Sequence, residues 1–331
     1  MRKVVTVFAA LGILGVAVWV YVATRHAPPA DTPQPDQQAK LPPVPQDGPA
    51  RAVRTVVSPL TPPSAHAPSF PRDIPDAIRR VTGAEEETAS RYTLRSEALG
   101  SLGKNLSGEE IQALLDYLAS TADALRPQRT AALKNDIMNV LRSQENVSDL
   151  LVPALARIFG DEGQDNTIRD YCIQHLGALL GEKPSLPQAD EIRKCLRAAA
   201  SAPAATYAGT ALIALNNDRA APPEGRAFLR SRAVAFASDP GAMPVIRMTA
   251  IQLAGENGFT EVLPALRRQL AEPRGDVPLN LTAIHALARL GDASDLALLA
   301  DFDGRNSSRR YAAALASAVR IFEERGISVR R

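Results

Sequence analysis

The chain has 331 residues, of which 45% are hydrophobic, enough for one elongated domain or two ordinary ones. Its 38 basic and 36 acidic side chains leave a formal charge of +2, which gives no global reason to expect nucleic acid or an acidic membrane as partner. Only 5% of the residues are aromatic and Trp19 is the single tryptophan, a balance that favours closely packed helices over sheets.

A long apolar segment opens the chain. Arg2 and Lys3 precede residues 4–23, which are uncharged and mostly apolar. Such a segment can cross a hydrocarbon layer of about 30 Å, and it is longer than the roughly 7–15 apolar residues of a cleaved secretory signal. Basic residues before it keep the N-terminus in the cytoplasm. Residues 1–25 therefore predict an uncleaved signal anchor: one transmembrane helix in a bacterial inner membrane, with the C-terminal domain in the periplasm or outside the cell.

Residues 26–75 are dense in Pro, Ala, Gln and Ser, and they include the pairs Pro28-Pro29, Pro42-Pro43 and Pro62-Pro63. Proline lacks a backbone donor and favours extended polyproline II, so this segment has little means of forming a packed core. We predict a disordered tether that joins the anchor to a folded domain.

Residues 76–331 repeat a two-helix pattern at a spacing of roughly 30–43 residues. The clearest unit is 244–270, where apolar residues recur at helical spacing, Gly255 and Gly258 interrupt the chain, and a second apolar stripe begins at Val262. Two helices joined by a glycine-containing turn form an αα-hairpin. Further units begin near Leu94, Leu133, Ile168, Thr206, Leu281 and Tyr311.

These units resemble HEAT repeats, in particular the short bacterial type related to the bilin-lyase HEAT-like family. The resemblance rests on an arginine at the start of the first helix (Arg169, Arg247), small residues along it, a Leu-Gly ending (Leu176-Gly177, Leu290-Gly291) and a leucine-rich second helix. It implies an all-α fold, a right-handed α-solenoid of about six or seven helical hairpins. In arrays of this kind the second helices usually line an extended concave surface.

Two predicted helix starts carry a capping-box pattern, in which a serine is followed three residues later by Glu or Gln. These are Ser107 with Glu110 and Ser185 with Gln188. In each case we expect the second helix of a hairpin to begin directly after the serine.

No catalytic motif is present: the sequence has no G-x-S-x-G, H-E-x-x-H, phosphate loop or dinucleotide glycine fingerprint. His175 and His285 lie on first helices, where we interpret them as packed or surface histidines. The acidic loop 161–165 lacks the alternating oxygen ligands of a calcium loop. The sequence therefore predicts no catalytic residue, no cofactor and no metal.

Cys172 and Cys195 are the two cysteines, and antiparallel packing of one hairpin sets them at the same height. A disulfide is feasible if their Cβ atoms face each other, and the chemistry outside the cytoplasm allows it. Two separate buried thiols are the main alternative, and a redox or metal role is the third.

The second helices of the middle repeats are rich in basic residues. They are Arg193, Lys194, Arg197, Arg226, Arg230, Arg232, Arg267 and Arg268. On a concave surface these side chains would form a groove for an acidic peptide or an anionic polymer of the envelope. The same helices begin with acidic residues, however, so the order of charges also fits simple compensation of the helix dipole. Nucleic acid is not expected, because base stacking needs aromatic side chains.

The leading hypothesis is a membrane-anchored, extracytoplasmic scaffold that binds another protein on its concave face and is not an enzyme. A structural spacer of the cell envelope, without a specific ligand, is the alternative. An enzyme of the bilin-lyase-like group is a third reading, for which the sequence offers only His175, His285 and scattered carboxylates as candidate acids or bases.

Overall fold

The structure is a computed structural model that describes residues 75–83, 91–121, 125, 127–202, 205–272, 276–306 and 309–327. All of the described helices belong to one compact unit, residues 62–331. The predicted anchor and tether fall on residues outside these ranges, except for Pro75. Among the described residues, no helix combines the length and apolarity needed to cross a membrane.

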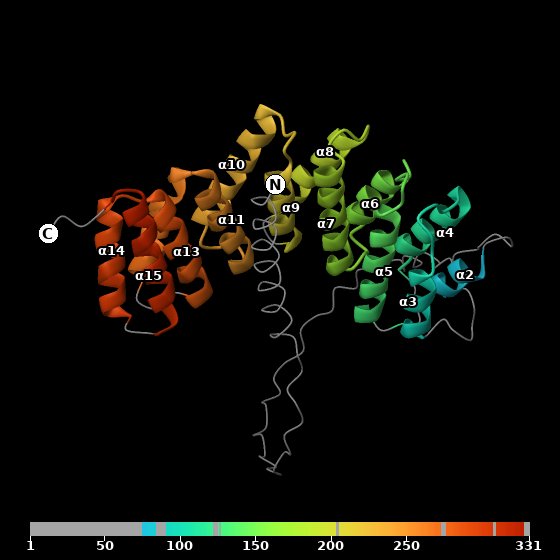
Figure 1. Ribbon diagram of the computed structural model, residues 1–331, viewed down its shortest axis with the longest axis horizontal. Coiled ribbons are helices and arrows are strands. Elements are labelled where there is room, and N and C mark those ends of the chain that lie inside the picture. The colour runs from blue at the N-terminus through green and yellow to red at the C-terminus, as the bar shows by residue number, and fades with distance from the viewer. Residues whose placement is uncertain are drawn as a thin grey trace, which may run out of the picture. The chain divides into compact units, whose positions relative to one another are not determined.

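The described residues form fourteen α-helices, one short 3-10 helix and no strand (Figure 1), which confirms the predicted all-α class. The helices are α2 (Asp76–Thr82), α3 (Tyr92–Gly100), α4 (Gly108–Ala119), α5 (Pro127–Arg142), α6 (Leu151–Gly160), α7 (Asn166–Glu182), α8 (Ala189–Ala199), α9 (Tyr207–Asn217), α10 (Pro223–Ser238), α11 (Pro244–Asn257), η1 (Thr260–Val262), α12 (Leu263–Ala271), α13 (Val277–Leu290), α14 (Ala293–Arg305) and α15 (Arg309–Glu324).

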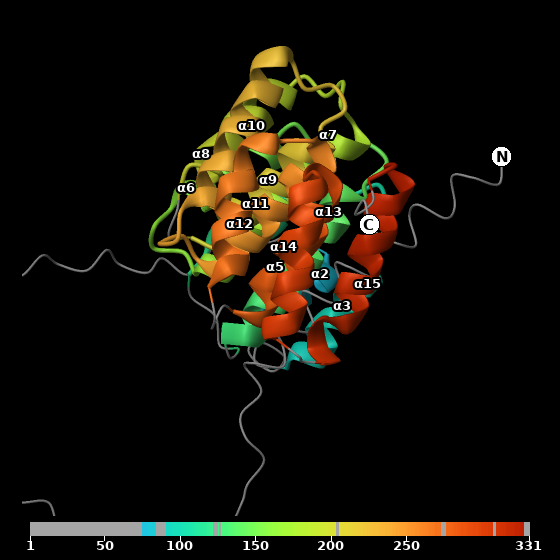
Figure 2. The same cartoon turned by 90° about the vertical axis from the view of Figure 1, so that its left-hand side faces the viewer.

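The helices stack in two layers. The odd-numbered helices α3 to α15 pack each against the next, and the even-numbered helices α2 to α14 cover them from one side. Figure 2 looks along the array, so that successive hairpins lie behind one another. Paired in the order that the sequence predicts, the described helices form six hairpins, from α3–α4 to α13–α14, with α2 before them and α15 after them. This agrees with the lower of the two predicted counts.

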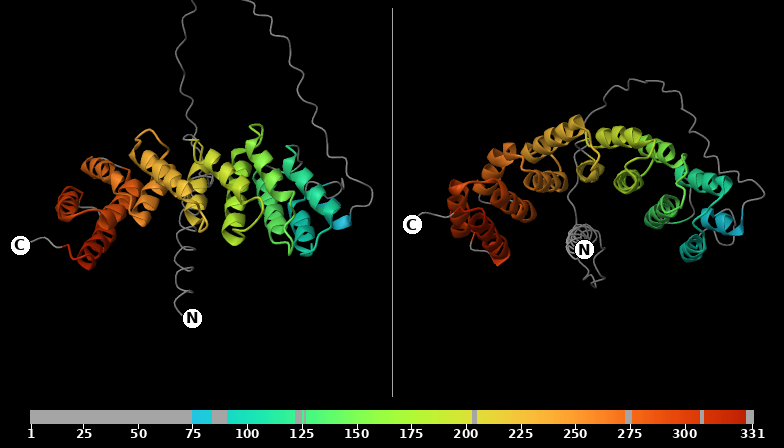
Figure 3. Two further views of the ribbon diagram at one scale, coloured as in Figure 1. Left: turned by 90° about the horizontal axis from the view of Figure 1, so that it is seen from above. Right: turned by 45° about the horizontal axis from the view of Figure 1, so that its top comes forward.

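The odd-numbered layer lies on the concave side of the helical unit, as the right-hand view of Figure 3 shows. We call this layer the inner layer, its solvent-exposed side the inner face, and the even-numbered layer the outer layer. The sequence predicts that the second helix of each hairpin lines the concave side. That expectation is wrong, because the second helices α4 to α14 form the outer layer.

Glycines in the inner layer explain this direction of curvature. A Cβ atom built at Gly177 of α7 would lie 2.4 Å from the Cβ of Ala214 in α9, so no side chain fits there. At Gly255 of α11 the same atom would lie 3.2 Å from the Cα of Ala286 in α13. At these two glycines, the backbone of one inner helix therefore lies directly against an alanine of the next inner helix. Because a row bends toward its more closely spaced layer, the inner layer becomes concave.

The predicted helix starts are right in one case and wrong in the other. The side chain of Ser107 accepts the backbone N–H of Glu110, and the Glu110 carboxylate accepts the N–H of Ser107 at 2.7 Å, a complete capping box. By contrast, α8 starts only at Ala189 and Ser185 caps nothing.

Basic residues in the first turn of inner helices cap the preceding outer helix. Arg95 donates to the carbonyl of Val81 at 2.7 Å, and Arg169 donates to that of Phe159 at 2.8 Å. These carbonyls stand at the C-termini of α2 and α6, where no intrahelical donor remains and a positive charge is favourable. Of the two arginines that support the family resemblance, Arg169 therefore joins α7 to the preceding outer helix, whereas Arg247 donates to Gln269 of α12 at 3.2 Å.

Candidate functional site

All seven residues predicted to bind a partner lie on the outer layer. They are Arg193, Lys194 and Arg197 on α8, Arg226 and Arg230 on α10, and Arg267 and Arg268 on α12. Arg232, which the sequence analysis grouped with them, donates to Ser201 at 3.2 Å. The structure therefore places the basic residues on the convex side of the helical unit.

Three of the seven basic residues, all arginines, form ion pairs with a later repeat. Arg193 binds Asp218, at the C-terminal end of α9, with an Nε–Oδ2 distance of 2.8 Å. Arg230 binds Glu261 of η1 at 2.7 Å. These arginines join successive hairpins, so their side chains are engaged within the protein.

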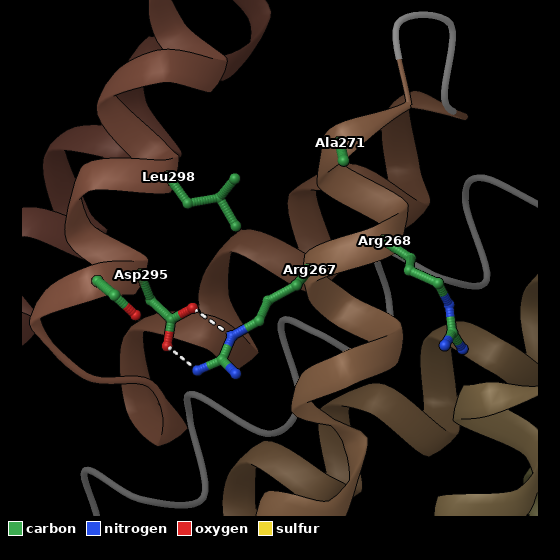
Figure 4. Close-up of a pocket in the computed structure, with 6 residues that line it drawn as sticks. Arg267, Arg268, Ala271, Asp295 and Leu298 are labelled. Carbon is green, nitrogen blue, oxygen red and sulfur yellow. Dashed lines mark hydrogen bonds and ion pairs between the residues drawn. The ribbon is translucent and has the colours of Figure 1, made fainter.

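Arg267 makes the third ion pair, shown in Figure 4. Its Nε and Nη2 atoms donate to the two carboxylate oxygens of Asp295 at 2.7 and 2.9 Å. Asp295 also accepts the backbone N–H of Asp292 and is 1% exposed. The pair lies in an open hollow of about 400 Å³ between α12 and α14. Arg268 points away from Asp295, toward the other side of α12 (Figure 4).

The other four basic residues form no ion pair among the described residues. Lys194, Arg226 and Arg268 are exposed, and Arg197 is half-buried. They are separated along three helices and are interspersed with the acidic residues that begin those helices.

A different set of side chains gathers on the inner face, where α5, α7 and α9 lie side by side. Tyr171 of α7 is half-buried at its centre. Burial raises the pKa of its hydroxyl, and the nearby carboxylates of Asp170, Asp136 and Asp165 raise it further. We call Tyr171 and these three carboxylates the acidic patch.

Two carboxylates of the acidic patch are partly withdrawn from water. Burial raises the pKa of Asp170, while a hydrogen bond from Thr210 of α9 lowers it. The Oδ1 atom of Asp170 is buried without a hydrogen-bond partner among the described protein atoms. Burial also raises the pKa of Asp136 on α5, against a hydrogen bond from Asn135 that lowers it.

His175 lies one turn beyond Tyr171 on α7 and is 5% exposed. Its Nε2 atom is 3.1 Å from Oδ1 of Asn135, which fixes the ring against α5. Burial, and to a smaller extent Arg142, lowers the pKa of His175 to about 4. The ring is therefore neutral at pH 7 and does not offset the charge of the acidic patch.

An exposed aliphatic side chain lies beside the acidic patch. Ile213 of α9 is 47% exposed and stands one turn beyond Thr210, which binds Asp170. Neighbouring inner helices run in the same direction, so the exposed Gln174 of α7 and Gln252 of α11 flank it. The inner face thus offers one aliphatic contact between two amides.

The remaining sequence-predicted candidates take no part in either surface. Cys172 of α7 and Cys195 of α8 are free thiols. Burial raises the pKa of Cys172 to about 12 and that of Cys195 to about 11. The disulfide between them remains a prediction. Among the described residues, no group of three or more His, Cys, Asp or Glu side chains is placed to hold a metal ion.

The acidic patch is not predicted from the sequence, because the residues that form it come from helices about 35 residues apart. Asp136, Asp170 and Thr210 occupy similar places in three successive first helices, a register that the repeat spacing predicts to within a few residues. A search for polar residues at the exposed positions of first helices would have found them.

The pH dependence of stability tests the environment of His175. Between pH 6.5 and about 4 the unfolded chain binds a proton at this residue that the folded protein does not, so the free energy of unfolding falls as the pH falls through this window. Replacement by glutamine, which can still donate to Asn135, removes this dependence. In urea titrations at pH 7 and pH 4.5, we expect the wild-type protein to lose on the order of 1–3 kcal/mol relative to His175→Gln.

His285 supplies the comparison for this measurement, because its side chain is exposed and burial lowers its pKa less than that of His175. His285→Gln should change the difference between the two pH values much less. Parallel curves for the wild-type protein and His175→Gln would show that the His175 ring is accessible to protons in the folded state.

The fold is that of an α-helical repeat protein, and one comparison with known protein families matches a part of the array. Residues 233–318 match the family model of HEAT repeats. This segment extends from the second half of α10 into α15 and confirms the predicted resemblance there.

Among solved structures, the chain is similar to human deoxyhypusine hydroxylase in complex with glycerol. The identity is 16%, the alignment covers 75% of this chain and 97% of the other, and the TM-score is 0.31. At that score the likeness supports no conclusion about site or activity. No curated protein matches the chain.

Proposed function

We propose that the protein is an interaction scaffold that binds an extended segment of another protein on its inner face. Helical repeat arrays present extended concave surfaces of this kind. The observation that carries the proposal is Ile213, a large aliphatic side chain left 47% exposed in the middle of an inner helix. Tyr171, half-buried on the adjacent inner helix α7, adds an aromatic side chain to this layer, and aromatic side chains are enriched at protein interfaces.

The proposal includes the predicted location. Residues 1–25 hold the chain in a bacterial inner membrane, residues 26–75 act as a tether, and the helical unit works in the periplasm or outside the cell. The support is the sequence alone, in which two basic residues precede twenty uncharged ones, and the N-terminal anchor lies outside the described residues.

A second candidate surface is the outer layer, with an acidic peptide or an anionic envelope polymer as ligand. The observation in its favour is that Lys194, Arg197, Arg226 and Arg268 form no ion pair among the described residues. We rank it second because Arg193, Arg230 and Arg267 are already neutralised by acidic partners.

Photo-crosslinking in native cells tests the proposed function. A photoreactive residue at Gln252, beside Ile213, is compared with one at the exposed Lys194 of the outer layer. We expect one discrete protein adduct from Gln252 alone. Ile213→Asp should reduce its yield about tenfold, since a charge replaces the aliphatic contact.

Leu150→Asp is the matched control variant, because Leu150 is 49% exposed at the start of α6 in the outer layer. It should leave the adduct unchanged. A diffuse set of adducts shared by both crosslinking positions, or an adduct insensitive to Ile213→Asp, would favour a structural spacer. A discrete adduct from Lys194 alone would favour the second candidate surface.

A further inference from the structure

The acidic patch differs from every acidic site of the outer layer described above. There, Asp218, Glu261 and Asp295 each have an arginine partner at 2.7 or 2.8 Å. None of the three carboxylates around Tyr171 forms an ion pair among the described residues. These three carboxylates are therefore each neutralised by an arginine, whereas the carboxylates of the acidic patch leave a local excess of negative charge.

The side chains that face the acidic patch do not compensate this charge. Asn135 and Thr210 are neutral hydrogen-bond partners of Asp136 and Asp170. Arg142 lies almost two turns from Asp136 along α5 and is paired with Glu182. Arg129 lies two turns away in the other direction.

His175, one turn beyond Tyr171 on α7, is buried against α5. The residue is 5% exposed, and its Nε2 atom is held by Asn135. Its Nδ1 atom has no hydrogen-bond partner among the described protein atoms. Asn135 in turn bonds Asp136. The buried ring therefore braces the amide that orients the more accessible carboxylate of the patch.

Partial burial makes this charge costly to maintain alone. Removing a carboxylate from water without a cation nearby is unfavourable, which is why the pKa values of Asp136 and Asp170 are both raised. A cation placed over the patch would offset that cost and would interact strongly, since water is already partly excluded. The complementary ligand is a guanidinium or ammonium group.

We infer that the inner face recognises a protein segment with an arginine or lysine side chain next to an aliphatic one. The cation lies over Asp136 and Asp170 beside Tyr171, and the aliphatic side chain lies on Ile213. Asp170 of α7 and Ile213 of α9 lie on adjacent inner helices, whose axes are about 8–10 Å apart, and a long arginine or lysine side chain next to an aliphatic residue of an extended peptide spans that distance. This inference rests on the proposed function of the inner face. It specifies a ligand opposite in charge to the one predicted from the basic outer helices.

Selection from an unbiased library tests the inference. A phage-displayed library of random dodecapeptides is panned against the full chain in detergent, and selected peptides are synthesised with fluorescent labels. We expect the selected peptides to share an arginine or lysine beside an aliphatic residue. Replacing that arginine by citrulline, its neutral isostere, should weaken binding about tenfold, as should Asp136→Asn.

Glu191→Gln is the matched control, because Glu191 is an exposed acid on α8 of the outer layer. It should leave the affinity unchanged, and circular dichroism of each variant verifies the fold. Selected peptides that need Ile213 but contain no basic residue, or that bind Asp136→Asn at full strength, would overturn the inference and leave the proposed function standing. Failure to select any peptide that needs Ile213 would overturn both.

Discussion

Replacing Asp218 by leucine is expected to lower the free energy of unfolding by about 3 kcal/mol. The Asp218 side chain is 1% exposed and accepts two hydrogen bonds from Arg193, at 2.8 and 3.3 Å. Without it Arg193 keeps only the ion pair with Asp190 at 2.8 Å, and because the Asp190 side chain is 95% exposed, the guanidinium between α8 and α9 has lost its buried counter-ion. The cost of an uncompensated buried charge exceeds the small net worth of most exposed ion pairs.

A double-mutant cycle separates this explanation from simple loss of packing. Urea unfolding is measured for Asp218→Leu, for Arg193→Met and for the double variant. The double variant should lose clearly less stability than the sum of the single variants, because it leaves no buried charge unpaired. Lys194→Met, at the exposed neighbouring position, should stay within about 0.5 kcal/mol of wild type. Additive losses would show that the two side chains do not depend on each other.

The fold could be predicted from the sequence because each hairpin carries its own signal. Apolar residues at helical spacing, glycine-containing turns and the capping box at Ser107 are local features, and their recurrence predicts stacking. The count of six hairpins and the antiparallel packing of α7 on α8 follow from these features and agree with the structure.

The role of glycine was harder to read from sequence. The pair Leu176-Gly177 predicts the end of a helix, but α7 continues to Glu182. Gly177 is the position at which α7 contacts Ala214 of α9. Gly258, by contrast, does end α11, with a positive φ of 74° that glycine adopts readily. A glycine inside a helical pattern marks either an end or a close approach, and only the neighbouring helix decides which.

The predicted location of the candidate sites depends on the same question of which helices approach each other closely. The basic residues were correctly assigned to second helices, but their assignment to the concave face was wrong, because the direction of curvature depends on which layer packs more closely. Their ion pairs also connect positions 25 to 31 residues apart, as Arg193 with Asp218 and Arg230 with Glu261 do. Such contacts depend on the register between repeats. The repeat pattern predicts that register only to within a few residues.

Replacing Gly177 by alanine is expected to destabilise the protein by about 1–3 kcal/mol, although alanine is the better helix former. The added Cβ would lie 2.4 Å from that of Ala214 and 3.5 Å from its Cα. The neighbouring atoms belong to a backbone and its first side-chain carbon, so no flexible side chain can move aside. α7 and α9 must separate, which opens the inner layer at the helices that carry Tyr171 and Ile213.

Gly181 supplies the matched control on the same helix. A Cβ atom at Gly181 meets nothing within 4 Å, so Gly181→Ala should stabilise the protein by roughly 0.4–1 kcal/mol through the lower entropy of the unfolded chain. Urea unfolding of both variants gives the sign of each change, and hydrogen exchange of α7 and α9 shows where the array opens. Equal stabilisation by the two alanines would mean that the inner helices are not held by this contact, and the physical basis for the concave inner face would then be lost.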